Sequence, residues 1–285
     1  MQAADQVWDV IIVGSGMGGA TLGYALARAG LTVLFCERGR SHVGNNAKSS
    51  LVGSYAETFA ANAWRDAKQL HDLLERGGRY CGEIGDRSNV RSKSFVPFLG
   101  SGTGGSSALY GMALERFFPS DFTPRRYHQG VNDATVPESW PISYEELEPY
   151  YHQAETLYRV RGEADPIRGE PADHLRSPNP MPTSQQALFE FLVGRGLHPY
   201  RLHMACEYVP GCQICQSYLC ARHCKNDGSR ICLEPALVEH GAALLDECEV
   251  VSLTATRARV TGVNCVRKGR GFSIEGRIEI GRAHV

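Results

Sequence analysis

The sequence lacks an excess of charge of either sign. Its 285 residues include 30 lysines and arginines and 31 aspartates and glutamates, which gives a formal net charge of −1. A nearly neutral chain without blocks of like charge has no long-range field that would attract nucleic acid or an anionic membrane. We therefore expect a small-molecule substrate and no nucleic-acid partner.

Long apolar runs and a basic leader are also missing. The first ten residues, MQAADQVWDV, pass almost at once into an apolar strand pattern, and no later run is long enough to span a bilayer. We therefore expect no transmembrane segment and a cytoplasmic protein. In that compartment the ten cysteines fit reduced thiols or ligands better than a disulfide framework.

Three glycines dominate what the sequence does contain. Gly14, Gly16 and Gly19 follow the apolar run Val10–Val13 with the G-x-G-x-x-G spacing. In dinucleotide sites these glycines provide a tight turn, a close approach of the backbone to a pyrophosphate, and close packing of helix on strand. The spacing, placed after a strand pattern, therefore predicts dinucleotide binding.

The residues after the glycines complete the pattern. Residues 20–29 read as a helix that Gly30 terminates, and residues 31–35 read as a second buried strand. This strand delivers Glu37, whose carboxylate is placed to accept hydrogen bonds from ribose hydroxyls. An acidic residue here disfavours the 2′-phosphate of NADP.

A second glycine-rich stretch lies between Phe98 and Phe122, with a helical start expected at Ala108. Its glycines and serines would let the backbone approach a second planar or phosphorylated group, and by composition alone it could equally be a flexible loop. Further helices are expected over residues 55–75 and 185–195. Another should begin at Ser143, which has Glu146 at the capping-box spacing.

Four stretches together resemble the glucose-methanol-choline (GMC) family of FAD-dependent oxidoreductases. They are the glycine unit that ends in Glu37-Arg38-Gly39, and the stretches 102–112, 140–155 and 248–263, where the last reads as a strand pair. The resemblance implies an α/β fold, with a doubly wound Rossmann-like FAD-binding sheet and an inserted α+β substrate domain. It also implies that the fold is incomplete at the carboxyl end.

The same resemblance implies an FAD site. The pyrophosphate would lie on the first glycine turn, the ribose at Glu37, the adenine at the backbone of Val250, and the ribityl chain and flavin along residues 104–107. Tyr110 stands where many relatives have Asn. The implied cofactor-binding residues are Gly14, Gly16, Met17, Gly18, Gly19, Glu37, Arg38, Gly104, Gly105, Ser106, Ser107, Tyr110, Gly111 and Val250.

The reaction implied is hydride transfer from the carbon of an alcohol, sugar, polyol or sterol to flavin N5. The electron acceptor would be oxygen, a quinone or a cytochrome. In the family the base is a histidine, paired with a histidine or asparagine near the carboxyl end. Nothing after Val263 resembles that segment, so we expect no catalytic residue here. The alternatives are an NAD-dependent dehydrogenase and a non-catalytic Rossmann scaffold with a metal-binding cysteine module.

Four cysteines form a cluster with the spacing C-x2-C-x4-C-x3-C. They are Cys212, Cys215, Cys220 and Cys224. Neither ferredoxin spacing matches fully, and a zinc ribbon would separate its cysteine pairs further. Some GMC dehydrogenases carry a small iron–sulfur cluster at this place in the chain. The candidates are therefore an iron–sulfur cluster, zinc, or structural thiols.

We expect four segments in the chain. Residues 1–130 form the first part of the FAD-binding domain, and residues 131–204 begin the substrate-binding domain. Residues 205–278 contain the cysteine cluster and return to the FAD-binding domain. Residues 279–285 read EIGRAHV, which one frame of a common sequencing adapter encodes, so we expect them to be foreign.

Overall fold

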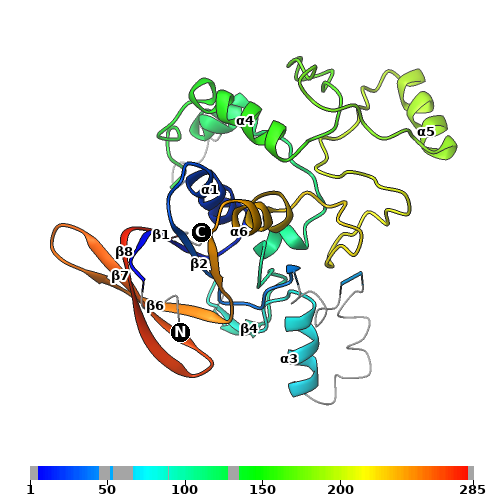
Figure 1. Ribbon diagram of the computed structural model, residues 1–285. Helices are drawn as coiled ribbons and strands as arrows, with labels where there is room; N and C mark the ends of the chain where they lie inside the picture. Colours follow the sequence, from blue (N-terminus) through cyan, green and yellow to red (C-terminus); the bar gives the residue numbers. More distant parts are fainter. Residues whose placement is uncertain (1–5, 45–51, 54–66, 89, 128–134, 282–285) are drawn as a thin grey trace. The chain divides into compact units, whose positions relative to one another are not determined.

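The computed structural model describes residues 6–44, 52–53, 67–88, 90–127 and 135–281 (Figure 1). The chain divides into two compact units, each treated separately below. One unit contains Met1–Met112 and Tyr208–Val285, and the other contains Ala113–Glu207. Within the described ranges, none of the helices combines the length and the apolar character that crossing a membrane requires.

The first unit is built on a mixed sheet. Strand order is β5-β2-β1-β8-β7-β6. The strands are β1 (Trp8–Val13), β2 (Val33–Cys36), β5 (Ala243–Leu245), β6 (Cys248–Ala255), β7 (Val260–Arg267) and β8 (Arg270–Gly281). The neighbouring strands β5, β2, β1 and β8 run parallel to one another. Strand β7 runs antiparallel to both of its neighbours, β8 and β6. The predicted mixed α/β fold with parallel strands is confirmed.

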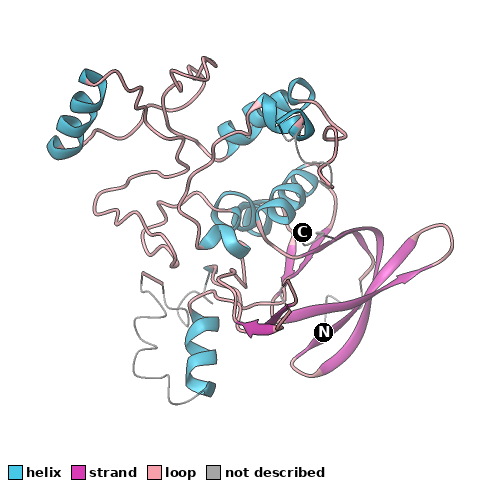
Figure 2. Ribbon diagram, turned by 180° about the vertical axis from the view of Figure 1, so that it is seen from behind, coloured by secondary structure: helices cyan, strands magenta, loops and turns pink. Residues whose placement is uncertain are grey.

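Strand β8 joins the two parts of the sheet. Its first half, up to Glu275, pairs antiparallel with β7, and the half from Gly276 onward pairs parallel with β1. Figure 2 shows the long antiparallel strands in magenta. The segment expected to be foreign begins at Glu279, inside β8, and its residues 282–285 lie outside the described residues.

The helical elements of this unit are mostly short. They are α1 (Met17–Arg28), α3 (Ala67–Arg76), the 3-10 turn η3 (Gly105–Ala108), the π-turn η6 (Ser229–Leu233) and α6 (Glu234–Glu239). A small hairpin pairs β3 (Ile84–Asp86) with β4 (Lys93–Phe95). The carboxyl-terminal part of the helix expected over residues 55–75 is confirmed as α3, and residues 54–66 lie outside the described residues.

The helix expected to start at Ala108 is wrong, because η3 ends there. The Ala108 carbonyl accepts a hydrogen bond of 2.9 Å from Lys225 Nζ. A carbonyl held in this way by a distant side chain is not used to continue a helical ladder. Gly104, the residue before this turn, has φ of +83°, a left-handed conformation that favours glycine.

Helix α1 packs closely on β2. A Cβ at Gly23 would lie 2.2 Å from the ring of Phe35, so only glycine leaves room for this buried ring. Burying a phenylalanine contributes about 1.5–3 kcal/mol. The small residues of α1 therefore let a large side chain of the sheet fill the helix–sheet interface.

In its described residues, the second unit contains two helices and two 3-10 turns. These are η4 (Pro119–Phe122), η5 (Pro124–Tyr127), α4 (Tyr144–Leu157) and α5 (Thr183–Gly194). The predicted capping box is confirmed. Ser143 Oγ accepts from the Glu146 N–H at 3.2 Å, and Glu146 Oε2 accepts from the Ser143 N–H at 2.8 Å. Helix α5 is confirmed as well, beginning two residues before its predicted start.

A buried ion pair holds α4 to the start of this unit. Arg116 Nε donates to Glu155 Oε1 at 2.7 Å, and Arg116 Nη2 donates to Glu155 Oε2 at 2.6 Å. His174 Nε2 lies 2.8 Å from the same Oε2. Burial raises the pKa of Glu155, but the hydrogen bonds and charges of Arg116 and His174 outweigh it, so the pKa lies below its ordinary 4.5.

We predict that Glu155→Gln destabilises this unit by about 3–5 kcal/mol at pH 7, because it leaves the buried Arg116 without its anion. Because the pKa of Glu155 is lower in the folded protein than the ordinary value of 4.5, ionised Glu155 stabilises the fold at pH values above 4.5. This contribution is lost as the pH falls through the pKa of the folded protein. The variant should therefore lose less stability than the parent on acidification. Urea unfolding at pH 7 and pH 4 measures this. Exposed Glu145 on the same helix is the control, and Glu145→Gln should change stability by less than about 1 kcal/mol.

Candidate functional site

The first glycine turn connects β1 to α1. Gly14 has φ of +87°, and its N–H donates to the Cys36 carbonyl of β2 at 2.8 Å. A Cβ at Gly19 would lie only 2.1 Å from the Gly14 carbonyl oxygen. Gly14 therefore provides the turn and Gly19 the close packing of helix on strand, which are the roles the spacing predicts.

The outer side of this turn is open. A Cβ at Gly14 or at Gly18 would have no atom within 4 Å. Gly16 is the N-cap residue of α1 and makes no side-chain cap hydrogen bond. Unpaired N–H groups and the helix dipole attract anions. The chain thus offers an uncapped helix terminus with room beside it, and these features fit a pyrophosphate.

Glu37 is buried and fully hydrogen-bonded. Its Oε2 accepts from the Ser15 N–H at 2.9 Å and from Ser15 Oγ at 2.7 Å. Its Oε1 accepts from the N–H groups of Gly39 at 2.9 Å and Gly102 at 3.3 Å. A carboxylate has about four acceptor positions. All four are used by the chain itself, so Glu37 clamps the first glycine turn to the second glycine-rich stretch.

The two glycine-rich segments lie side by side. The Gly104 N–H donates to the Ser15 carbonyl at 3.1 Å, and Gly16 and Gly104 form a parallel bridge. Gly102 has φ of +111°, and a Cβ there would lie 2.4 Å from the Arg40 carbonyl oxygen. The second stretch is therefore a fixed turn against the first, which decides against the flexible-loop interpretation.

The other expected cofactor residues lie around these turns. Ser107 Oγ donates to the Gly104 carbonyl at 2.6 Å, and Ser106 Oγ accepts from the Gly100 N–H at 3.1 Å. Tyr110 Oη donates to the Asn226 carbonyl at 2.6 Å, and a Cβ at Gly111 would lie 3.2 Å from Gln216 Nε2. Val250 is partly buried in β6.

Residues 225–229 belong to this site, although the glycine patterns do not indicate them. The Gly228 N–H donates to Ser107 Oγ at 3.0 Å, and a Cβ at Gly228 would lie 2.9 Å from Met17 Cα. Lys225 Nζ donates to the Ala108 carbonyl at 2.9 Å and the Tyr218 carbonyl at 3.2 Å. The sequence feature that could have indicated this segment is Gly228, which lies between polar residues shortly after the cysteine cluster.

Two buried charged groups lie in this segment. Burial lowers the pKa of Lys225, although Asp227 and the neighbouring thiols oppose the shift. Burial raises the pKa of Asp227, although the backbone N–H groups of Arg230 and Ser229 oppose it. The segment therefore carries a lysine and a carboxyl group that both resist ionisation, directly beside the second glycine turn.

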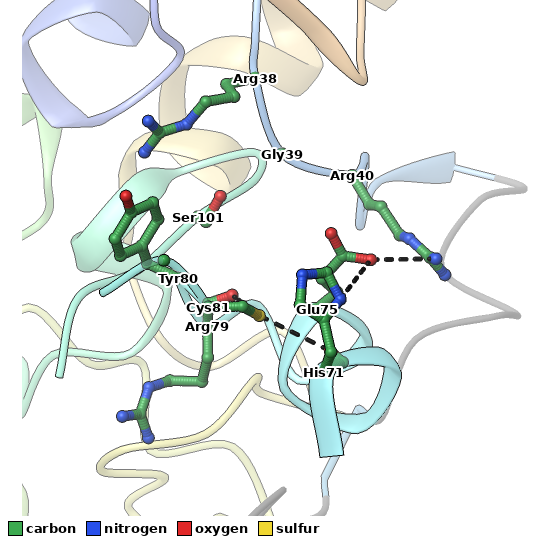
Figure 3. Close-up of a pocket in the computed structure, with 10 residues that line it drawn as sticks. Arg38, Gly39, Arg40, His71, Glu75, Arg79, Tyr80, Cys81 and Ser101 are labelled. Carbon is green, nitrogen blue, oxygen red and sulfur yellow. Dashed lines mark hydrogen bonds and ion pairs between the residues drawn. The ribbon is translucent and has the colours of Figure 1, made fainter. Parts of the chain in front are cut away.

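A small cavity of about 140 Å³ is lined by Arg38 and Gly39, the residues that directly follow Glu37 in the sequence (Figure 3). Arg38 lies at its edge, with its guanidinium 4.6 Å from the Tyr80 ring centroid. Arg40 Nη2 pairs with Glu75 at 3.1 Å, and His71 also points toward that carboxylate. Cationic side chains thus outnumber carboxylates in its lining.

The cysteine cluster lies beside Lys225. Cys212 Sγ and Cys220 Sγ lie 3.2 Å and 3.4 Å from Cys224 Sγ. Burial raises the pKa of Cys220, but hydrogen bonds from the N–H groups of Lys225, Arg222 and Cys224 outweigh it and lower the pKa. Burial raises the pKa of Cys215 and of Cys224. Cys220 is thus the thiol best prepared to act as a ligand.

Comparison with known proteins agrees with this geometry. A family described as "NAD(P)-binding Rossmann-like domain" matches residues 12–76. The 6'''-hydroxyparomomycin C oxidase of Streptomyces lividus is 27% identical over 281 residues, which cover 94% of this chain and 46% of that protein. The gluconate 2-dehydrogenase flavoprotein of Pantoea cypripedii is 24% identical, with 90% of this chain and 47% of the relative covered.

The solved structure of pyridoxine 4-oxidase from Mesorbium loti aligns with a TM-score of 0.54 at 16% identity. It covers 96% of this chain and 49% of the oxidase, and it is similar in fold. The chain spans about half the length of the curated relatives it matches. These relatives are oxidases and dehydrogenases, so the resemblance to the GMC oxidoreductases is confirmed, with the Rossmann-like domain that it implies.

Proposed function

We propose that this chain forms the FAD-binding part of an oxidoreductase that acts on a CH–OH donor. The observation that supports this most strongly is the pairing of two glycine turns through Ser15, Gly104 and Glu37. A dissociable NAD needs one glycine turn to bind its pyrophosphate. A second glycine turn fixed against the first suits a cofactor such as FAD, which extends beyond the pyrophosphate site. The sequence similarity to a named flavoprotein supports the same choice.

The residues that would hold FAD follow from this geometry. The open turn at Gly14, Met17 and Gly18, with the N–H groups of the α1 terminus, would bind the pyrophosphate. Glu37 and Arg38, with the backbone of Val250, would bind the adenosine half. Residues 104–107, with Tyr110 and Gly111, would line the ribityl chain and flavin. When bound, FAD supplies the acceptor for a hydride.

The rest of the reaction is assigned by class only. The donor is an alcohol such as a sugar, polyol or sterol, and the electrons pass on to oxygen, a quinone or a cytochrome. We assign no catalytic base among these 285 residues. In this proposal, Glu37 and the two glycine turns would bind and orient FAD. The chain also holds Lys225 and Asp227 out of water beside the second turn.

The cysteine cluster is assigned as a ligand set for an iron–sulfur cluster. The close approach of Cys212, Cys220 and Cys224, and the N–H groups that converge on Cys220, support thiolate ligands there. Lys225 connects this cluster to the second glycine turn. Iron and acid-labile sulfide in anaerobically purified protein test the assignment. Zinc alone, or no metal at all, would reject it.

We predict that Ser15→Ala leaves FAD binding intact or tightens it. Ser15 Oγ takes the acceptor position on Glu37 that a ribose hydroxyl would need, so removing it frees that position. The free energy of unfolding should fall by about 1 kcal/mol from the lost hydrogen bond. Titration with FAD, followed by flavin fluorescence, measures the affinity. A tenfold weaker affinity would contradict a ribose site on Oε2 of Glu37.

The function itself is tested with the product of the complete reading frame. The purified protein should carry a flavin absorption spectrum, and an alcohol or sugar donor should bleach it under anaerobic conditions. A colourless protein that reduces added NAD with the same donors would reject the flavin assignment in favour of an NAD-dependent dehydrogenase. A protein that binds FAD but is bleached by no CH–OH donor would support a non-catalytic scaffold.

A further inference from the structure

Three other cysteines meet inside the first unit, away from the cluster at Cys212–Cys224. Cys36 ends β2, Cys248 begins β6 and Cys265 lies in β7. Their Sγ atoms all lie within 4.8 Å of one another. Strand β2 is far in the sequence from β6 and β7, which follow one another and pair antiparallel, so the fold of the sheet brings the three cysteines together.

The three thiols lie in a dry environment. Each residue is at most 1% exposed, and the same core cluster contains Trp8 and Ile274. The Cys248 N–H donates to the Glu37 carbonyl at 2.9 Å, and Cys265 is the register partner of Val250. The group therefore lies directly behind the part of the sheet that presents Glu37, and it faces the core.

The ligand set is trigonal and purely sulfur. No histidine or carboxylate joins these thiols within 4.8 Å in the part of the chain that the structure describes. Zinc in structural sites is almost always four-coordinate, so a dry three-sulfur set does not suit it. Soft thiolate ligands select soft ions such as Cu(I).

We propose that Cys36, Cys248 and Cys265 form a binding site for a soft monovalent metal ion of the Cu(I) class. The bound ion would join β2 to the β6–β7 pair as a crosslink. Each thiol that binds the ion as a thiolate releases its proton to the buffer, and no electron is transferred. The site is independent of the proposed oxidoreductase function.

The three thiols also shift one another's pKa. Hydrogen bonds from the Cys265 and Cys36 thiols lower the pKa of Cys248 to about 4. Hydrogen bonding with Cys248, and then with Cys265, raises the pKa of Cys36. Hydrogen bonding with Cys248 also raises the pKa of Cys265 to about 12.

Anaerobic competition between the reduced, metal-free chain and a chromogenic Cu(I) chelator tests the proposal. Because the other cysteine cluster can bind Cu(I) too, the titration uses the chain with Cys212, Cys215, Cys220 and Cys224 replaced by serine. We expect one Cu(I) per chain. Cys248→Ala should weaken this binding by more than about 100-fold, since even loss of an outer-shell partner costs roughly 10–100-fold. Cys81→Ala, which alters a cysteine outside both groups, should leave it unchanged.

A second measurement covers variants that fold poorly. In the chain with all other cysteines intact, Cys265→Ala should lower the number of Cu(I) ions bound by one, whereas Cys81→Ala should not. The melting temperature of the parent should rise on addition of Cu(I), and that of Cys265→Ala should rise less. The proposal is overturned if the stoichiometry and the shift in melting temperature are the same in both variants.

Discussion

Gly19→Ala is expected to abolish FAD binding and to destabilise the first unit by about 3 kcal/mol or more. The added Cβ would lie 2.1 Å from the Gly14 carbonyl oxygen and 3.1 Å from the Ile12 side chain. Overpacking of a well-packed core typically costs about 1–3 kcal/mol, and here the obstacle is backbone that cannot rotate away. Flavin titration and urea unfolding of the variant measure the two effects.

Gly18→Ala is the matched control, one residue earlier in the same helix. A Cβ at Gly18 would have no atom within 4 Å, and the residue lies within α1. Alanine should therefore keep the stability or raise it by about 0.4–1 kcal/mol. Equal losses of stability in the two variants would show that the turn is sensitive to any substitution, and that the specific packing role of Gly19 is wrong.

Glu37→Gln is expected to be the second most damaging change. The carboxylate accepts four hydrogen bonds, three from backbone N–H groups and one from Ser15 Oγ. An amide keeps one oxygen, and its NH₂ group would face N–H donors. Hydrogen bonds to charged groups contribute about 1.5–3 kcal/mol each, so we expect a loss of at least about 3 kcal/mol. FAD affinity should fall more than tenfold, because the clamp between the two turns is lost.

Glu249→Gln provides the control for this change, because Glu249 is an exposed residue of β6. It should alter the free energy of unfolding by no more than about 0.5 kcal/mol. Unfolding and FAD titration of both variants should be measured at one temperature where each is folded. If Glu37→Gln behaves like Glu249→Gln, then Glu37 does not hold the turns together.

Local patterns predicted the parts of the fold that depend on neighbouring residues. The strand, glycine turn and helix around Gly14 and Gly19 follow from short-range sterics, and the capping box at Ser143 follows from hydrogen bonds within one turn. The strand pair at residues 248–263 could be predicted from the sequence for the same reason. These features require no knowledge of the distant chain.

Long-range contacts explain what the sequence could not reveal. The turn at Ala108 ends because Lys225 takes its carbonyl across more than a hundred residues. The position of Gly228 against Met17, and the convergence of Cys36 with Cys248 and Cys265, likewise depend on how the sheet folds back on itself. Glu37 was expected to bind ribose, and its additional contact with Gly102 depends on the second glycine turn.

The most direct test of the central claim is calorimetric titration of the apoprotein, from the complete reading frame, with FAD and separately with NAD. The account predicts one FAD per chain, no comparable binding of NAD, and loss of FAD binding in Gly19→Ala. Tighter binding of NAD than of FAD, or FAD binding that Gly19→Ala leaves unchanged, would contradict it.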